Sequence, residues 1–168
     1  MRQMTTTIQM TGALDPRDGW VAENCPMAAA LDIVRNRSAF LILREAFYGA
    51  TRFEEFTERT GVSEPVTAAR LHELTEDGLL EREPYREPGQ RTRQAYRLTE
   101  KGSDLLPVLV ALMQWGDRWE RGSRTRVEIR HRDCGAPVTA QLRCAHDHPV
   151  AGDELELGVR RRRRRAAV

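Results

Sequence analysis

The chain has 168 residues, of which 40% are hydrophobic, enough for one substantial core with a small appendage but not for two full domains. It contains no run of about 20 apolar residues that could span a membrane, and residues 1–12 lack the basic start and apolar middle of a signal peptide, so we expect a cytoplasmic protein. Three irregularly spaced cysteines exclude a disulfide framework, and a net charge of +2 does not by itself indicate a basic or acidic partner.

The first part of the chain predicts an arm followed by two helices. Residues 1–24 are of mixed polarity and contain Pro16 and Gly19, so we expect a mostly irregular arm. A first helix is expected from Pro26, because proline suits a first turn and apolar residues follow at helical spacing. These apolar residues are Met27, Ala30, Leu31 and Val34. Ser38 is a candidate N-cap of a second, core helix that Gly49 ends.

Two further helices are predicted close together. Residues 53–60 form a compact third helix, and Gly61 marks a tight turn after it. Ser63 is the candidate cap of a fourth helix that Gly78 ends. Its predicted inward stripe consists of Val66, Leu71 and Leu74. Two helices joined by so short a turn are typical of the helix-turn-helix motif.

A β-hairpin and a long helix are predicted next. Residues 79–86 and 93–98 are expected to be strands around the turn Pro88-Gly89, with a basic tip. Residues 99–119 have the apolar periodicity of a long helix capped by Thr99. Pro107 lies inside this stretch, so the helix either has a false start near Thr99 or kinks at the proline.

The composition changes after Gly122. Residues 126–132 and 138–143 are candidates for two short strands around the turn Asp133-Cys134-Gly135, which would make a small β-hairpin appendix. Residues 160–165 are six consecutive arginines. Because like charges repel, we expect this tail to be disordered, and it either adds non-specific phosphate affinity or is merely solvated.

Several motifs, in this order, resemble the HxlR-type winged helix-turn-helix regulators, and the resemblance covers residues 25–119. The motifs are Cys25-Pro26, Gly61-Val62-Ser63 with Arg70-Leu71, Asp77-Gly78-Leu79-Leu80-Glu81-Arg82, Tyr96-Arg97-Leu98-Thr99-Glu100-Lys101-Gly102 and Leu112-Met113-Gln114-Trp115-Gly116-Asp117. The resemblance implies a homodimer that binds a roughly palindromic operator in double-stranded DNA. It also implies regulation of a nearby gene, as a repressor or an activator, and a response to a small-molecule or oxidant effector.

The expected fold is therefore α+β, mainly α: a winged helix-turn-helix with a long C-terminal dimerisation helix and a small β-hairpin appendix. The expected division is an N-terminal arm at 1–24, the DNA-binding and dimerisation domain at 25–121, the appendix at 122–158 and the arginine-rich tail at 159–168. We expect the first helix and residues 105–119 to form the dimer interface, because both carry more apolar surface than a monomer would cover.

The fourth helix is the expected recognition helix. Its candidate groove-facing residues are Ser63, Glu64, Thr67, Ala68 and Arg70. Arg70 can bond a guanine in a bidentate manner, and Thr67 offers a hydroxyl and a methyl group. The alternative for Arg70 is an ion pair with Glu73 or Glu76 along the helix surface.

The hairpin is the expected wing. Its candidate DNA-binding residues are Arg86, Gln90, Arg91 and Arg93. Arginines on a protruding hairpin are well placed for phosphates or for a narrow minor groove. The alternative is a solvated loop in which Glu81, Glu83 and Glu87 form ion pairs with the arginines.

Cys25 is the candidate redox-sensing residue. It precedes Pro26 at a helix N-terminus, where the helix dipole favours the reactive thiolate. Relatives that resemble this chain use a cysteine at this position as a redox switch. The alternative is a small buried hydrophobe without reactivity.

Cysteines and histidines near the C-terminus suggest a zinc site. The candidate ligands are Cys134, Cys144, His146 and His148, with His131 nearby. Two thiolates and two imidazoles complete a tetrahedral zinc site. Asp147 stands where longer relatives have a further cysteine or histidine, and the alternative is a metal-free hairpin.

Two other classes of function compete with a sequence-specific regulator. A winged-helix protein–protein interaction module without an operator would favour an acidic or neutral wing, whereas this wing is basic. An enzyme would need a catalytic motif, and the chain has no glycine-rich phosphate loop, nucleophile elbow or metalloprotease motif. We therefore expect a DNA-binding regulator, with repression the favoured mode of action.

Overall fold

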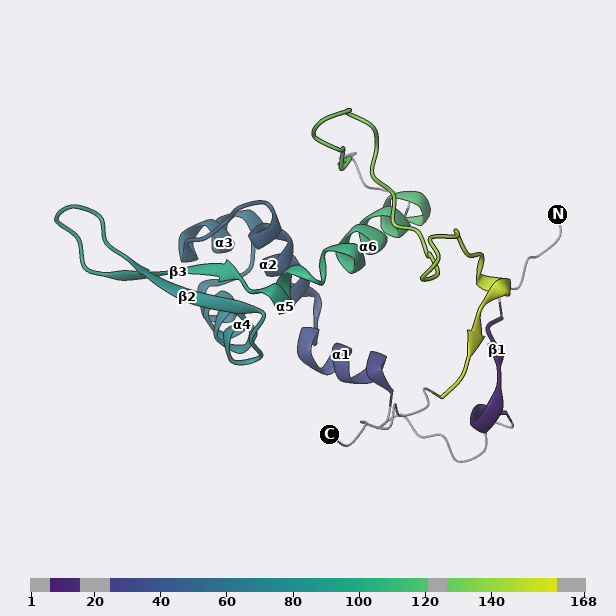
Figure 1. Cartoon of the computed structure of the whole chain (residues 1–168). Helices are drawn as coiled ribbons and strands as arrows, with labels where there is room; N and C mark the ends of the chain where they lie inside the picture. The colour runs from purple at the N-terminus through teal and green to yellow at the C-terminus, as the bar shows by residue number, and fades with distance from the viewer. Residues whose placement is uncertain (1–6, 16–24, 121–126, 160–168) are drawn as a thin grey trace, which may run out of the picture. The chain divides into compact units, whose positions relative to one another are not determined.

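The computed structural model describes residues 7–15, 25–120 and 127–159 (Figure 1). These residues belong to two compact units, one spanning Pro26–Ala140 and the other combining residues up to Cys25 with residues from Gln141 onward. Parts of the expected arm (1–6 and 16–24) and the arginine run at 160–165 lie outside the described residues. None of the described helices has the length and hydropathy needed to cross a membrane.

The larger unit follows the predicted order of elements. Its elements are α1 (Pro26–Val34), α2 (Arg37–Phe47), α3 (Phe53–Thr60), α4 (Glu64–Glu76), β2 (Leu80–Tyr85), β3 (Arg93–Leu98), α5 (Glu100–Ser103) and α6 (Leu106–Trp119). Helices α2 to α4, the two-stranded wing and the long helix α6 make a winged helix-turn-helix, so the predicted fold class is confirmed.

The N-cap of α2 differs from the prediction. The side-chain oxygen of Asn36 accepts a hydrogen bond from the backbone N–H of Ala39 at 3.1 Å, which satisfies one of the unpaired donors of the first turn. Ser38, the expected cap, lies inside the helix and donates its hydroxyl to the same oxygen of Asn36 at 2.7 Å. The expectation for Ser38 was therefore wrong by two residues.

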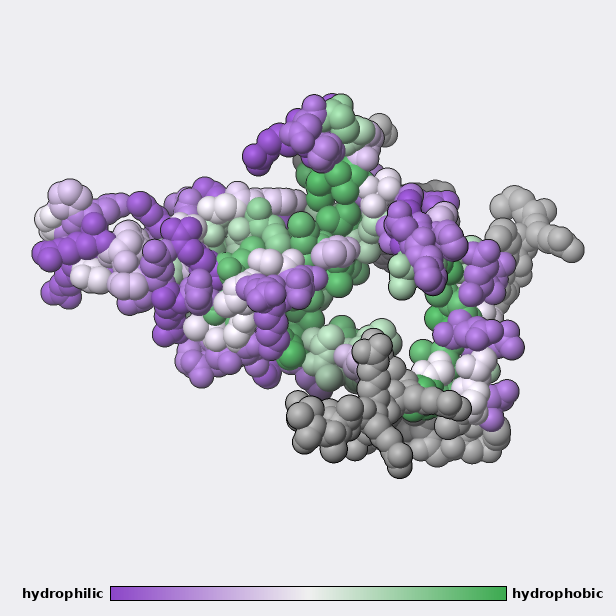
Figure 2. Space-filling view, in the orientation of Figure 1, coloured by the Kyte–Doolittle hydropathy of each residue, from purple (hydrophilic) through white to green (hydrophobic). Residues whose placement is uncertain are grey.

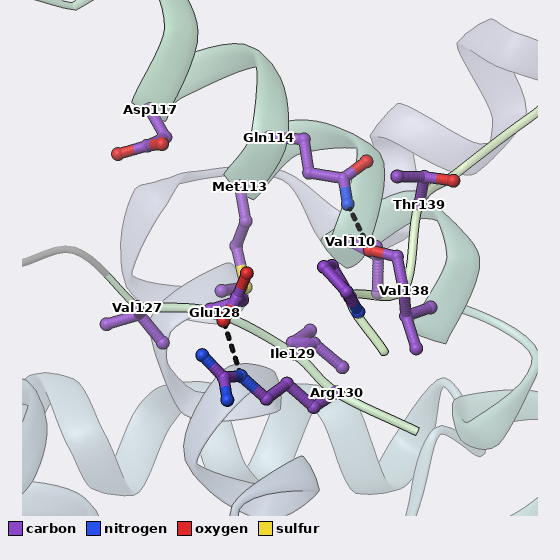
Figure 3. A pocket seen from close by; sticks show the side chains of 11 residues that line it. Val110, Met113, Gln114, Asp117, Val127, Glu128, Ile129, Arg130, Val138 and Thr139 are labelled. Carbon is purple, nitrogen blue, oxygen red and sulfur yellow. Dashed lines mark hydrogen bonds and ion pairs between the residues drawn. The ribbon is translucent and has the colours of Figure 1, made fainter. Parts of the chain in front are cut away.

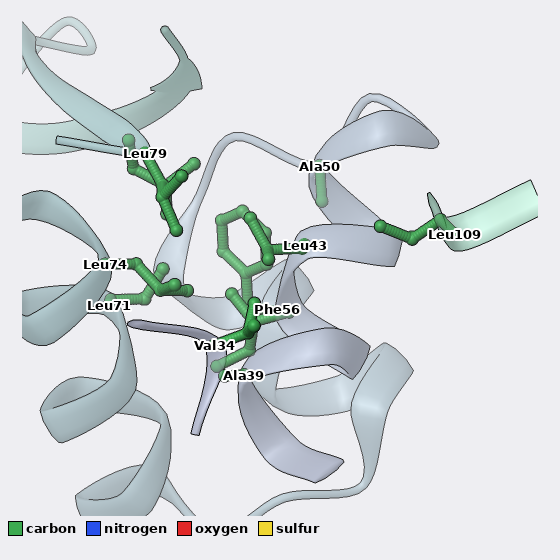
Figure 4. Packing of buried hydrophobic residues seen from close by; sticks show 11 residues of the cluster. Val34, Ala39, Leu43, Ala50, Phe56, Leu71, Leu74, Leu79 and Leu109 are labelled. Carbon is green, nitrogen blue, oxygen red and sulfur yellow. The ribbon is translucent and has the colours of Figure 1, made fainter. Parts of the chain in front are cut away.

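The core lies between α2, α3 and α4 (Figure 4). Phe56 of α3 is completely buried, with Leu43 of α2 on one side and Leu71 and Leu74 of α4 on the other. Tyr96 of the wing meets Phe56 edge to face, with ring centroids 6.2 Å apart. This cluster fixes α4 on the surface of α2 and α3.

The wing is a regular antiparallel hairpin that projects away from the helices (Figure 1). Its register runs from Leu80 opposite Leu98 to Tyr85 opposite Arg93, so both strands lie within the predicted ranges. The segment before α3 joins it, because Arg52 pairs with Ala95 and the N–H of Tyr96 donates to the carbonyl of Thr51 at 2.8 Å. The base of the wing is thus part of the helical core.

The long helix is interrupted, as Pro107 led us to expect. The helical turn of α5 starts at its N-cap Thr99, and α6 begins at Leu106 with Pro107 in its first turn. Thr99 also donates its hydroxyl to the carbonyl of Gly78 at 2.7 Å. This bond holds α5 against the end of α4, where an added Cβ on Gly102 would lie 2.1 Å from the carbonyl oxygen of Leu79.

The segment after α6 is simpler than the predicted two-stranded hairpin. One isolated bridge joins Arg130 to Pro137, and a turn containing Gly135 closes it. The carboxamide of Gln114 donates to the carbonyl of Val138 at 2.7 Å and accepts from the N–H of Ala140 at 2.9 Å. One polar side chain of α6 therefore holds this segment.

The smaller unit brings the two terminal regions of the chain together. Strand β1 (Gln9–Met10) pairs in parallel with β4 (Glu156–Leu157), and a short 3₁₀ helix accompanies each strand, at Gly12–Leu14 and Gly152–Glu154. The described part of the arm, residues 7–15, thus contains a strand that pairs with the C-terminal region. A local pattern could not indicate a two-residue strand whose partner is far away in the sequence.

Candidate functional site

The turn between α3 and α4 has the geometry of a helix-turn-helix. Helix α3 ends at Gly61, which adopts the left-handed conformation at φ 66° and donates its N–H to the carbonyl of Thr57 at 3.1 Å. Ser63 precedes α4, and Pro65 occupies its first turn. Because glycine tolerates this conformation, the chain reverses within three residues and places α4 across α3.

The buried face of α4 consists of Thr67, Leu71 and Leu74, at steps of four and three residues. Val66 was expected to point inward and Thr67 outward, and both expectations were wrong. Val66 is 40% exposed, whereas Thr67 is fully buried and its hydroxyl donates to the carbonyl of Val62 at 3.4 Å. Leu71 and Leu74 determine which side of α4 faces the core. Val66 precedes Leu71 by five residues, which is not a helical repeat, so Val66 lies on another side of the helix.

The solvent-facing side of α4 is built largely from small residues. The exposed residues at the start and along this side are Ser63, Glu64, Pro65, Ala68, Ala69, His72 and Glu76. Ser63, Glu64 and Ala68 are exposed as predicted. Ala69 and His72 were missed, although the spacing of Pro65, Ala69, His72 and Glu76 is helical and would have indicated this stripe.

Arg70 forms an ion pair along the helix, which was the predicted alternative to contact with a base. Its guanidinium forms an ion pair with Glu73, one turn further along α4, and its side chain is only 22% exposed. The Nε atom of Arg70 is buried and has no hydrogen-bond partner among the described residues. In this arrangement Arg70 lies along the side of α4, and other residues make up the exposed face.

His72 connects the exposed face of α4 to the wing. Its Nδ1 lies 3.3 Å from Nη2 of Arg82 on β2 and 4.0 Å from Oε1 of Glu76. The side chain of His72 is 62% exposed. A polar surface therefore continues from α4 to the cationic side chain of Arg82 on β2.

The wing is fixed to α3 by ion pairs. Arg93 reaches Glu54 at 2.7 Å, and Arg52 reaches Glu87 at 2.7 Å while lying over the ring of Tyr85. These pairs tie the two ends of the predicted DNA-binding loop to the helices. They also occupy Arg93, one of the predicted DNA contacts.

The tip of the wing has a different character. Arg86 donates to the backbone carbonyl of Gln90 at 3.1 Å, and the side chain of Gln90 donates to Glu87 at 3.0 Å. Arg91 is exposed and makes neither a hydrogen bond nor an ion pair within the described part of the chain. The tip thus presents Arg91 to solvent without a partner among the described residues, whereas the Nε of Arg86 is bonded within the tip itself.

The cysteines lie in two kinds of environment. Cys25 is half-buried and directly precedes Pro26, the first residue of α1, as predicted. Cys134 and Cys144 are exposed, and all three are free thiols.

The predicted zinc ligands are divided between the two units, with Cys134 in the larger one and Cys144, His146 and His148 in the smaller one. Nδ1 of His131 lies 3.2 Å from Sγ of Cys134 in the larger unit, and the rings of His146 and His148 lie 6.3 Å apart in the smaller one. Within residues 7–15, 25–120 and 127–159, no group of three or more Cys, His, Asp or Glu side chains could hold a metal ion.

Two helices carry apolar side chains that this chain leaves uncovered. On α6 the exposed stripe consists of Val108, Leu112, Trp115 and Trp119, and on α1 it consists of Met27 and Leu31. The α6 residues recur at steps of four, three and four, so they share one face of the helix. Apolar residues also gather over the start of α6 in Figure 2.

Comparisons with known proteins agree with this architecture. A family model described as HxlR-like helix-turn-helix matches residues 33–124. The HTH-type transcriptional regulator Rv3095 of Mycobacterium tuberculosis is 42% identical over 127 residues, which cover 75% of this chain and 77% of the relative.

Solved structures support the same fold. The crystal structure of PA1607, a candidate transcription factor, matches with a TM-score of 0.71 and 36% identity, covering 81% of this chain and 95% of that one. The redox regulator HypR in its oxidized form matches with a TM-score of 0.51 and 27% identity, covering 56% of this chain and 96% of that one.

Proposed function

This chain belongs to the HxlR-like helix-turn-helix family and is an HTH-type transcriptional regulator, and from this premise we propose that it is a homodimeric repressor of a roughly palindromic operator. The observation that carries the proposal is the exposed face of α4, flanked by the basic wing. A helix of this kind fits the major groove of DNA.

The exposed residues of α4 suit base reading at short range. Ala68 and Ala69 present methyl groups that can contact thymine, and their small size lets the helix lie deep in the groove. His72 offers a ring nitrogen to a base edge or a phosphate, and Ser63 and Glu64 lie at the helix start. Thr67 is excluded from this role because it is buried.

The wing supplies the phosphate contact. Arg91 at the tip is the arginine that we assign to the DNA backbone, because Arg93 is occupied by Glu54. Arg86 and Gln90 then shape the tip rather than bind DNA. A phosphate contact increases affinity for any sequence, so specificity rests on α4.

The apolar stripes of α1 and α6 support the homodimer. Trp115 and Trp119 are 58% and 59% exposed, and aromatic residues of this kind are enriched at protein interfaces. A two-fold axis through α6 would relate two copies of α4. Half-sites separated by one turn of DNA, about 34 Å, would then be read together.

We propose that oxidation of Cys25 lowers operator affinity. Two observations support the proposal: Cys25 lies at the start of α1, whose apolar face is part of the proposed dimer surface, and HypR is a redox regulator of the same fold. Hydrogen peroxide would transfer one oxygen to the Cys25 thiolate, giving sulfenic acid with release of hydroxide. The test compares operator binding by wild type and Cys25→Ser before and after peroxide, and an equal response of both would contradict the proposal.

The central experiment measures fluorescence anisotropy with labelled DNA from the region upstream of the chain's own gene. We expect saturable binding that survives an excess of unrelated competitor DNA. If the chain binds no DNA at low salt, the alternative of a winged-helix protein–protein interaction module replaces the proposal.

A further inference from the structure

A groove of about 660 Å³ lies between α6 and residues 127–139 (Figure 3). This volume is in the range of small-molecule sites, which is about 300–1,000 Å³. Most of its lining is apolar and consists of Val110, Met113, Val127, Ile129, Pro137 and Val138. Apolar walls with a few polar groups are typical of ligand sites.

The walls of the groove are held in place by hydrogen bonds. Gln114 fixes the segment to α6 through Val138 and Ala140. The N–H of Val138 also donates to the carbonyl of Ile129 at 2.8 Å, which joins the two sides of the segment. These polar groups are paired with each other. The rest of the groove wall is therefore formed mainly by apolar side chains.

The charged side chains among the described lining residues favour a cation. Glu128 and Arg130 form an ion pair at 2.5 Å and so neutralise each other (Figure 3). Asp117 of α6 also lines the groove and has no ion pair among the described residues. The described lining therefore carries one net negative charge, at the end of an apolar surface.

The groove lies on the side of α6 opposite the exposed stripe. At about 100° per residue, the groove residues Val110, Met113, Gln114 and Asp117 are centred about 180° from the stripe formed by Val108, Leu112, Trp115 and Trp119. A molecule in the groove would press on the helix whose other face forms the proposed dimer surface. Binding in the groove can thus change the position of α6 in a dimer.

We propose that this groove is an effector site for a small apolar molecule with a single cationic group, and that its occupation changes operator affinity. The effect on operator affinity rests on the proposed function, whereas binding of the small molecule in the groove does not require DNA. The apolar body would lie against Ile129 and Val138, with the cation near Asp117.

The binding test uses calorimetric titration of the full chain with tetraphenylphosphonium, and with tetraphenylborate as a probe of the same shape but opposite charge. We expect the cation to bind saturably and more tightly than the anion. Val138→Trp should abolish binding, because the indole fills the groove. Asp117→Asn should weaken cation binding about threefold, since exposed ion pairs contribute modestly.

Asp104→Asn is the matched control, because Asp104 is an exposed carboxylate on the turn before α6 and does not line the groove. It should leave binding unchanged. Circular dichroism checks that each variant is folded. Tighter binding of the anion, or undiminished binding by a folded Val138→Trp variant, would overturn the proposal.

The regulatory test repeats the anisotropy titration with tetraphenylphosphonium at saturating concentration. We expect operator affinity to change in the wild type and not in Val138→Trp. Unchanged operator affinity with the cation bound would disprove the effector role. If the chain binds no operator at all, the calorimetric result still decides whether the groove binds cations.

Discussion

At the scale of single residues, His72 and Thr67 occupy opposite sides of α4. His72 is exposed beside Arg82, whereas Thr67 is fully buried and bonded to the carbonyl of Val62. Arg82 donating to Nδ1 would leave Nε2–H free to donate to DNA, because a neutral imidazole carries its proton on the nitrogen that does not accept.

We predict that His72→Ala weakens operator binding by about tenfold, the size of one lost base or phosphate contact. Thr67→Val, which keeps the shape of the buried side chain, should leave operator affinity within about twofold, because only contacts inside the protein change. Fluorescence anisotropy measures both. A larger loss with Thr67→Val than with His72→Ala would contradict the assignment of the exposed face.

Gly102 is required for close approach of α5 to the start of β2. A Cβ at this position would lie 2.1 Å from the backbone oxygen of Leu79, and a backbone atom cannot rotate away. We expect Gly102→Ala to lower the free energy of unfolding by about 3 kcal/mol. Urea denaturation followed by circular dichroism measures the change.

Gly116→Ala is the control for this prediction. An added Cβ on Gly116 meets nothing within 4 Å, and the residue lies inside α6. Alanine has the higher helix propensity, so this variant should be neutral or more stable by up to about 1 kcal/mol. Equal destabilisation by both variants would mean that steric contact is not the cause.

At the scale of elements, the arginines of the wing differ in role. Arg93 forms an ion pair that holds the wing to α3, whereas Arg91 is exposed at the tip. We predict that Arg91→Gln reduces the salt slope of DNA binding, the change of log K with log salt, by about one unit, as for one lost phosphate contact. Arg93→Gln is the matched control and should leave the slope unchanged, because Arg93 pairs with Glu54. The opposite pattern would assign the phosphate contact to Arg93.

The start of α3 depends on a carboxylate. Glu55 accepts hydrogen bonds from the backbone N–H groups of Thr51 and Arg52, at 2.8 and 3.0 Å. These bonds, together with the nearby cation of Arg59, hold the pKa of Glu55 below its usual value of 4.5. Protonation would remove the negative charge that these donors stabilise.

This lowered pKa predicts a pH dependence of stability. The stabilisation by Glu55 is fully present above pH 4.5, the usual pKa in the unfolded chain, and is lost as the pH falls through the lower pKa of the folded state. Glu55→Gln should cost about 1 kcal/mol near pH 7, as for loss of a helix cap, and less at acid pH. Denaturation at several pH values checks this, and a constant difference between variant and wild type would contradict it.

At the scale of the whole molecule, the exposed stripes of α1 and α6 predict a dimer. Leu112 lies at the middle of the α6 stripe and is 51% exposed. Leu112→Glu should turn the dimer into a monomer in sedimentation at micromolar concentration, because a buried charge without a partner is costly. Operator affinity should fall with it, since two linked half-sites bind more tightly than one.

Leu142→Glu is the control for the dimer prediction. Leu142 is similarly exposed at 59% but belongs to the other unit. This variant should sediment like the wild type. A wild-type chain that is monomeric at these concentrations would contradict the dimer itself.

The order and the approximate ends of the helices and strands of the helix-turn-helix and the wing follow from local sequence signals alone. Three residues, Gly61, Pro65 and Gly78, favour particular backbone angles at their own positions. Residues close in sequence are therefore enough to predict where the turn and α4 lie. The hairpin was predictable for the same reason, because alternation and the Pro88-Gly89 turn lie within one short segment.

Tertiary packing decides which side of α4 faces solvent and which partners the wing arginines bind. The inward side of α4 depends on how Leu71 and Leu74 meet Phe56, so Thr67 became buried and His72 exposed. Glu54, the partner of Arg93, lies 39 residues away in sequence. Such long-range contacts arise from packing of whole elements, and no local pattern of residues encodes them.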